Sequence, residues 1–176
     1  MALYVKKVYM GTLKLILIFS IIITLKVHSI EISEVQSGYM CGVESGMSFV
    51  CHDTQDIYLT DQSKCTFNKE VVPCTWYGYS FIYTENIKGS SLQCLYKSSK
   101  KATAGNTVEI TGRNVNSFEF ELVLEKESGF FSNPLYSVYK IRDKKEEPEI
   151  ARWLCKAEGK TVLDISLRLY SPALPF

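Results

Sequence analysis

Six cysteines, all downstream of a hydrophobic leader, constrain the fold of this chain more than any other feature. An even set of cysteines in an exported chain indicates a disulfide framework, here formed by Cys41, Cys51, Cys65, Cys74, Cys94 and Cys155. The chain has no C-x-x-C pair and only two histidines, so we expect neither a metal site nor a cofactor. The spacing leaves the pairing open, but the partner of Cys155 should tie the C-terminal part of the fold to the N-terminal part.

The leader has the composition of a signal peptide. Lys6, Lys7 and Lys14 precede the apolar run Leu15–Leu25, Lys26 follows it, and Val27–Ser29 offers a cleavage site before Ile30. The run is shorter than the roughly 20 apolar residues that cross a bilayer, although a retained anchor stays open as the alternative. We therefore expect residues 1–29 to be a signal peptide and residues 30–176 to form a single secreted domain without membrane contact.

Charge gives no support for binding through phosphates. The leader contains four lysines and no acidic residue, so the remaining chain has more acidic than basic residues. Proteins that bind nucleic acids mainly through phosphates usually show a basic surplus or a basic stripe. The basic clusters at residues 97–101 and 142–145 are typical of solvated loops.

Alternating apolar residues predict strands in the C-terminal half. Phe118–Leu124 and Thr161–Leu169 both have the period of two that is typical of half-buried strands. Leu135–Ile141 and Arg152–Cys155 are shorter candidates. Turns are expected between these strands, which should therefore pair antiparallel, at Ser128-Gly129, Asn133-Pro134, Glu147-Pro148 and Glu158-Gly159.

The N-terminal half is less regular. Ser45–Leu59 has a loose helical period and predicts a short helix, whereas Trp76–Tyr83 is an aromatic strand or hairpin candidate. Lys97–Gly105 is expected to be an exposed loop. The predicted fold class is therefore α+β, with one short helix packed on a twisted antiparallel sheet and stabilised by disulfides.

Two stretches resemble known families. Tyr39-Met40-Cys41 resembles the Tyr/Phe/Trp-x-Cys motif near the mature N-terminus of powdery mildew secreted effector candidates. Phe130–Ile141 and Pro148–Ser166 together are similar to the C-terminal core of the fungal guanyl-preferring ribonucleases. Powdery mildew effectors with this ribonuclease-like fold join the two resemblances, because they commonly keep the scaffold and lose the active site. The resemblance implies a microbial ribonuclease-like domain.

The resemblance also implies that the catalytic groups are lost. Phosphodiester transfer in that family needs a base, a histidine acid and an arginine that holds the phosphate charge. Arg152 falls at the arginine position, Ser137 replaces the base, and Ser166 replaces the acid, or Asp164 if the register slips. A serine cannot supply a proton near neutral pH as an imidazole can, so we expect no catalytic residue.

The sequence therefore predicts a secreted, non-catalytic effector that binds a host protein or RNA on a ribonuclease-like scaffold. Its candidate binding residues are Arg152, Trp76, Tyr77 and Tyr79, since aromatic side chains dominate interfaces. One alternative is an active secreted ribonuclease, in which His52 or Glu119 approaches Arg152. Another is an unrelated secreted cysteine-rich protein, such as an inhibitor or adhesion module, which a sheet without a packed helix would favour. Delivery into host cells and the oligomeric state stay open.

Overall fold

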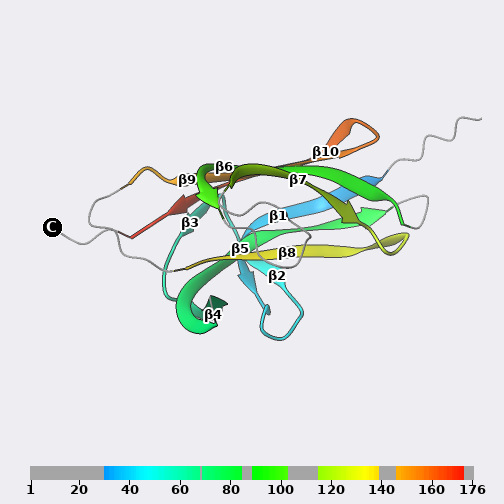
Figure 1. Ribbon diagram of the computed structural model, residues 1–176. Helices are drawn as coiled ribbons and strands as arrows, with labels where there is room; N and C mark the ends of the chain where they lie inside the picture. The colour runs from blue at the N-terminus through cyan, green and yellow to red at the C-terminus, as the bar shows by residue number, and fades with distance from the viewer. Residues whose placement is uncertain (1–29, 68, 85–88, 103–114, 139–145, 173–176) are drawn as a thin grey trace, which may run out of the picture.

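The computed structural model describes residues 30–67, 69–84, 89–102, 115–138 and 146–172 of the chain (Figure 1). Within these ranges the backbone forms ten strands and no helix. The strands are β1 (Glu31–Cys41), β2 (Phe49–Asp53), β3 (Asp56–Tyr58), β4 (Ser63–Phe67), β5 (Glu70–Thr84), β6 (Ser91–Ala102), β7 (Val115–Val123), β8 (Ser128–Val138), β9 (Glu149–Ala157) and β10 (Lys160–Tyr170).

The strands form two sheets. In the first sheet β5 is the central strand: β1 and β4 pair with successive parts of one edge, β8 pairs with the other edge, and β2 pairs with β1. The second sheet has the order β3-β10-β9-β6-β7. All pairs are antiparallel except β3 with β10, which is parallel. Figure 1 shows β6, β7, β9 and β10 in a layer above β5 and β8.

The core lies between the two sheets. Alternate residues of β5, from Tyr77 to Tyr83, point toward the second sheet, where the Tyr79 ring lies 5.6 Å from the Trp153 ring. The second sheet contributes inward-facing side chains from β6, β9 and β10. Because β-strands place successive side chains on opposite faces, one strand can build the core and still present a different set of residues outward.

Several predicted strands are confirmed. Phe118–Leu124 overlaps β7, and Thr161–Leu169 lies inside β10 with Leu163, Ile165, Leu167 and Leu169 buried. The last two strands are antiparallel neighbours joined by a turn at Glu158-Gly159, where both residues have positive φ. Trp76–Tyr83 lies within β5, Arg152–Cys155 lies within β9, and the described part of Leu135–Ile141 belongs to β8.

The predicted α+β fold is wrong, because the described chain is all-β. The expected helix at Ser45–Leu59 is instead a turn followed by β2 and β3. Ile57 and Leu59 are buried on either side of the exposed Tyr58, which is the period of a strand. The helix packed on a sheet that the expected ribonuclease-like fold class includes is therefore absent from the described residues, whereas the family resemblance itself stays a prediction.

Three expected turn or loop segments belong wholly or partly to strands. Asn133-Pro134 lies inside β8, paired with Tyr79 and Gly78 of β5, and Ser128-Gly129 begins that strand. A proline is tolerated on a strand at the edge of a sheet, and β8 pairs only with β5 among the described strands. Lys97–Ala102 continues β6, while residues 103–105 of that predicted loop lie outside the described residues.

The six cysteines form three disulfides, Cys41–Cys51, Cys65–Cys74 and Cys94–Cys155. The predicted framework is therefore confirmed, and three disulfides are typical of a secreted or extracellular protein. Cys94 and Cys155 are direct partners in the β6–β9 pair, with their Cα atoms 4.1 Å apart. The bond of Cys155 thus joins two adjacent strands of the second sheet that are distant in sequence.

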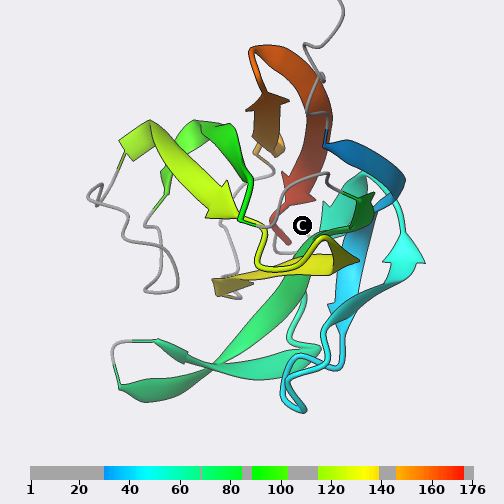
Figure 2. The ribbon, with the colours of Figure 1, turned by 90° about the vertical axis from the view of Figure 1, so that its right-hand side faces the viewer.

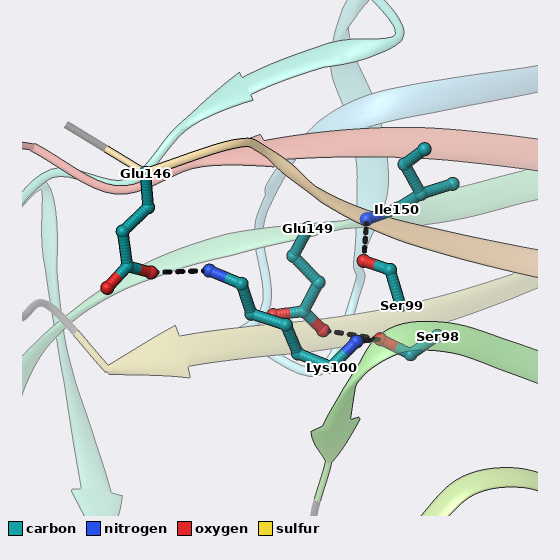
Figure 3. A network of polar contacts seen from close by, with 6 residues as sticks. All are labelled: Ser98, Ser99, Lys100, Glu146, Glu149 and Ile150. Carbon is teal, nitrogen blue, oxygen red and sulfur yellow. Dashed lines mark hydrogen bonds and ion pairs between the residues drawn. The ribbon is translucent and has the colours of Figure 1, made fainter.

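A polar network fastens the end of β6 to the start of β9 (Figure 3). The Ser98 hydroxyl donates to a carboxylate oxygen of Glu149 at 2.7 Å, and the Ile150 amide donates to the Ser99 hydroxyl at 2.9 Å. The Lys100 ammonium pairs with Glu146 at 2.6 Å. These contacts continue the β6–β9 association beyond the last residues that pair in the sheet.

Candidate functional site

Arg152, the arginine that the resemblance singled out, lies on the outer face of the second sheet. Its neighbours in β9, Ala151 and Trp153, face the core, so its own side chain is exposed. The guanidinium makes a bidentate contact with Asp164, with nitrogen–oxygen distances of 2.7 and 2.6 Å. Hydrogen bonding from Arg152 lowers the pKa of the Asp164 carboxyl below its ordinary value. Two of the guanidinium N–H groups are therefore already occupied within the chain.

The serines at the expected base and acid positions do not share a site. Ser166 is the β10 residue directly opposite Arg152 in the second sheet. Ser137 lies on β8 in the first sheet, where its hydroxyl donates to the Tyr77 hydroxyl at 3.3 Å. The structure therefore does not bring together Ser137, Ser166 and Arg152.

The residues that could rescue catalysis are also distant from Arg152. His52 is exposed on β2 in the other sheet, where it pairs with Tyr39. Glu119 lies on β7, and β6 separates β7 from β9, so two strand spacings, about 10 Å, lie between the backbones of Glu119 and Arg152. General acid–base catalysis requires hydrogen-bond reach, and the hydrogen bonds described for the Arg152 guanidinium go to Asp164.

Of the three candidate aromatic anchors, Trp76 alone is partly exposed, although its indole Nε1 is buried. Tyr77 and Tyr79 are buried between the sheets, and burial raises the pKa of both hydroxyls, that of Tyr79 to about 12. Trp76 points to the opposite face of β5, where its ring meets the half-exposed Tyr136 ring edge-on at 5.1 Å. The Tyr136 hydroxyl donates to the Thr66 carbonyl on β4 at 3.1 Å, which holds this ring across the sheet.

A shallow groove of about 650 Å³ adjoins Trp76. Its walls are the β1–β2 connection from Met40 to Ser45 and the segment Asp61–Lys64 that leads into β4. Its charged lining residues are Glu44, Asp61 and Lys64. The groove thus lies between the β1–β2 hairpin and the β4–β5 hairpin, which occupy the lower part of Figure 2.

Each of these hairpins exposes apolar side chains close to its tip. Met47 and Phe49 of the first hairpin are 75% and 49% exposed, and Phe67 and Val71 of the second are 43% and 69% exposed. Together with Trp76 on β5 and its partner Tyr136 on β8 they make up what we call the hairpin surface: Met47, Phe49, Phe67, Val71, Trp76 and Tyr136. Phe67 is paired with Glu70 and Val71 with Thr66, so these two side chains point to opposite faces and the surface wraps around the tip of the second hairpin. Several exposed apolar side chains at the tips of two hairpins are a candidate interaction site.

Both hairpins are held by a disulfide near their exposed residues. Cys41–Cys51 closes the first hairpin, and Cys65–Cys74 closes the second. The turn of the first hairpin is further ordered by backbone bonds from Ser45 and Met47 to the Gly42 carbonyl. A hydrogen bond of 2.8 Å between the hydroxyls of Ser48 and Ser132 attaches it to β8. A surface that is ordered before binding loses less conformational entropy when a partner binds.

Sequence reasoning found Trp76 but missed the rest of the hairpin surface. The available signal was the presence of apolar residues inside two short cysteine intervals, 41–51 and 65–74. In an oxidised chain, such intervals are candidates for closed hairpins. The Tyr39 of the Tyr-x-Cys motif has a structural contact here, because its hydroxyl accepts a hydrogen bond from the Tyr58 amide at 2.7 Å and so joins β1 to β3.

No protein-family model matches this sequence, and no curated protein matches it either. Within the described ranges no helix could cross a bilayer. The same residues contain no group of three or more histidine, cysteine, aspartate or glutamate side chains placed to hold a metal ion.

Proposed function

We propose that this chain is a secreted, non-catalytic effector that binds a host protein through the hairpin surface. The observation that carries the proposal is the pair of disulfide-closed hairpins that expose apolar side chains on either side of the Trp76 groove. The Tyr39-Met40-Cys41 motif, with its resemblance to powdery mildew effector candidates, supports the effector role. The scaffold in this proposal is the two-sheet fold, not the ribonuclease-like fold.

Charge favours a protein partner over RNA. The groove has two acidic lining residues and one basic one. On the outer face of the second sheet, Arg152 and Arg168 each form a bidentate ion pair with an aspartate, Asp164 and Asp56 respectively. RNA binding through phosphates needs cations that are not already neutralised, whereas protein interfaces are rich in aromatic and apolar anchors.

The test is affinity capture from host extracellular fluid with the purified oxidised protein, followed by a direct binding measurement with each protein identified. The disruptive variant is Phe67→Ser with Val71→Ser. Its matched control is Ile82→Ser with Phe130→Ser, a cross-strand pair on the first sheet that is 36% and 56% exposed and absent from the hairpin surface. We expect the disruptive variant to weaken binding at least tenfold and the control to bind like the wild type.

Two outcomes would overturn the proposal. The first is a partner whose affinity is lost in the control variant and kept in the disruptive one. The second is tight binding to a single-stranded RNA probe that persists in the disruptive variant, or cleavage of that probe that depends on Arg152. Circular dichroism of each variant verifies that the fold is intact.

A further inference from the structure

The three disulfides differ in their access to solvent. Cys65, Cys74, Cys94 and Cys155 are all buried, with at most 5% of any of these residues exposed. Cys41 and Cys51, in contrast, are both exposed. Thiol–disulfide exchange requires a thiolate to reach one sulfur of the bond, so access is one of the factors that set the rate.

The exposed disulfide also lies beyond the part of β1 that pairs with β5. The pairing of β1 with β5 ends at Tyr39, two residues before Cys41. Beyond that point the hairpin pairs only with itself, through Met40 with Val50 and Cys41 with Phe49. Among the described strands, β2 has β1 as its single partner. The region between the two cysteines is therefore a hairpin end without a second neighbouring strand.

This disulfide belongs to the hairpin surface. Cys41 lines the Trp76 groove, and the loop that it closes carries Met47 and Phe49. Besides the disulfide and the pairing of β1 with β2, this loop is ordered by short bonds to the Gly42 carbonyl, a bond from the Gly46 amide to the Val43 carbonyl, and the Ser48–Ser132 hydrogen bond. Hydroxyl and turn hydrogen bonds that solvent can reach contribute little net free energy, because water replaces them.

We propose that Cys41–Cys51 is a redox latch: low-molecular-weight thiols open it selectively, and its opening disorders the first hairpin of the binding surface. This inference rests on the proposed function only for the consequence that opening weakens partner binding. The surface is then complete in an oxidising compartment and incomplete where reduced glutathione is abundant. The partner that it selects is accordingly an extracellular protein.

The chemistry is an ordinary two-step exchange. A glutathione thiolate attacks one sulfur of the bond, which forms a mixed disulfide and releases the other cysteine as a thiolate. A second glutathione thiolate attacks the mixed disulfide, releases the remaining cysteine, and leaves as oxidised glutathione. Two electrons move from two glutathione molecules to the protein disulfide, and the two cysteine thiolates take up protons according to their pKa values.

The latch is tested first without any partner. The oxidised protein is incubated with increasing concentrations of reduced glutathione, quenched by alkylation, and digested, and the alkylated fraction of each cysteine is measured by mass spectrometry. We expect Cys41 and Cys51 to be modified at least ten times faster than the other four. Equal rates for all six cysteines, or earlier modification of any buried pair, would overturn the inference.

The second measurement follows the hairpin itself. Amide hydrogen exchange is compared between the wild type and the double variant Cys41→Ser with Cys51→Ser, which fixes the open state. We expect faster exchange confined to residues 40–51, with β9 and β10 unchanged. Unchanged exchange in residues 40–51 would mean that the Cys41–Cys51 disulfide does not order the hairpin, and it would refute the proposed redox latch. Neither measurement uses a binding partner, so failure of the proposed function leaves both results interpretable.

Discussion

The Cys94–Cys155 disulfide should contribute more stability than either hairpin disulfide. The perturbation is Cys94→Ala with Cys155→Ala, compared with Cys65→Ala and Cys74→Ala as a matched pair of buried cysteines. Alanine is chosen because it introduces no new polar group between strands. Both double variants remove two buried sulfur atoms, and because only Cys94 and Cys155 belong to the core cluster, any difference in packing adds to the loop-length effect in the same direction.

The magnitude follows from those loop lengths. Cys94 and Cys155 are 61 residues apart in sequence, whereas Cys65 and Cys74 are 9 apart. In the chain-entropy account of disulfide stabilisation, these loops correspond to about 4 kcal/mol and about 2.6 kcal/mol at 25 °C. Loss of the sulfur contacts adds a cost to both variants, and that cost is larger for Cys94 and Cys155 because they belong to the core cluster. We therefore expect the free energy of unfolding to differ by at least roughly 1.5 kcal/mol between the two variants.

The assay is urea unfolding of each protein, followed by far-ultraviolet circular dichroism and by tryptophan fluorescence to verify that the two transitions coincide. Unfolding free energies are compared after extrapolation to water, because removing a cross-link changes the slope as well as the midpoint. The reasoning is refuted if the two double variants lose equal stability, or if loss of Cys65–Cys74 costs more. Either result would mean that native-state contacts, and not loop closure, dominate.

Three further changes have outcomes that the contacts define. In Gly78→Ala the added Cβ would lie 2.1 Å from the Asn133 carbonyl oxygen, so thermal unfolding should show that the free energy of unfolding falls by more than about 2 kcal/mol. In the control Gly129→Ala the added Cβ meets only side-chain atoms, at 3.2 Å or more, so the free energy of unfolding should fall by less. Because burial raises the pKa of Tyr79 to about 12, its contribution to stability is complete below pH 10 and decreases as the pH rises toward 12, so part of the phenolate absorbance should appear only with unfolding. Arg152 lowers the pKa of Asp164, so this ion pair stabilises the folded protein at pH values above the ordinary carboxyl pKa of 3.8, and the stabilisation is lost as the pH falls through the lowered pKa. In urea unfolding, Asp164→Asn should therefore be slightly destabilising at pH 7 and neutral in strong acid.

The strands with the clearest sequence signal, in β7 and β10, are those in which one face is more buried and the other is solvated. In β10, four aliphatic residues alternate with polar ones, and this pattern fits only a strand that covers a core on one side. The same reasoning failed at Ser45–Leu59, because β2 lies at a sheet edge with both faces largely exposed. An edge strand held by pairing and a disulfide needs no apolar alternation, so its sequence resembles that of a loop or an irregular helix.

The conformation of Asn133-Pro134 and the availability of Arg152 both depend on tertiary contacts that the local sequence does not encode. Asn133-Pro134 was expected to be a turn, but the long β5 strand offers β8 eleven consecutive partners, and this pairing outweighs the local turn preference. Arg152 was expected to be available for a ligand, but the register of β9 against β10 places Asp164 beside it. Register is set by the whole sheet and could not be read from either strand alone.

The second hairpin is exposed because β5 is longer than the core that lies between the two sheets. Residues 77–83 of β5 belong to the core cluster between the sheets, whereas neither Cys65 nor Cys74 is part of that cluster. The segment from Glu70 to Pro73 is exposed or half-buried and pairs with β4 alone, and a two-stranded hairpin without a covering layer is marginally stable in water. Here Cys65–Cys74 and the Tyr136 ring stabilise the hairpin instead. Because a cross-link fixes the backbone without covering the side chains, Phe67 and Val71 stay ordered and exposed at the same time, which is the combination that a rigid binding surface requires.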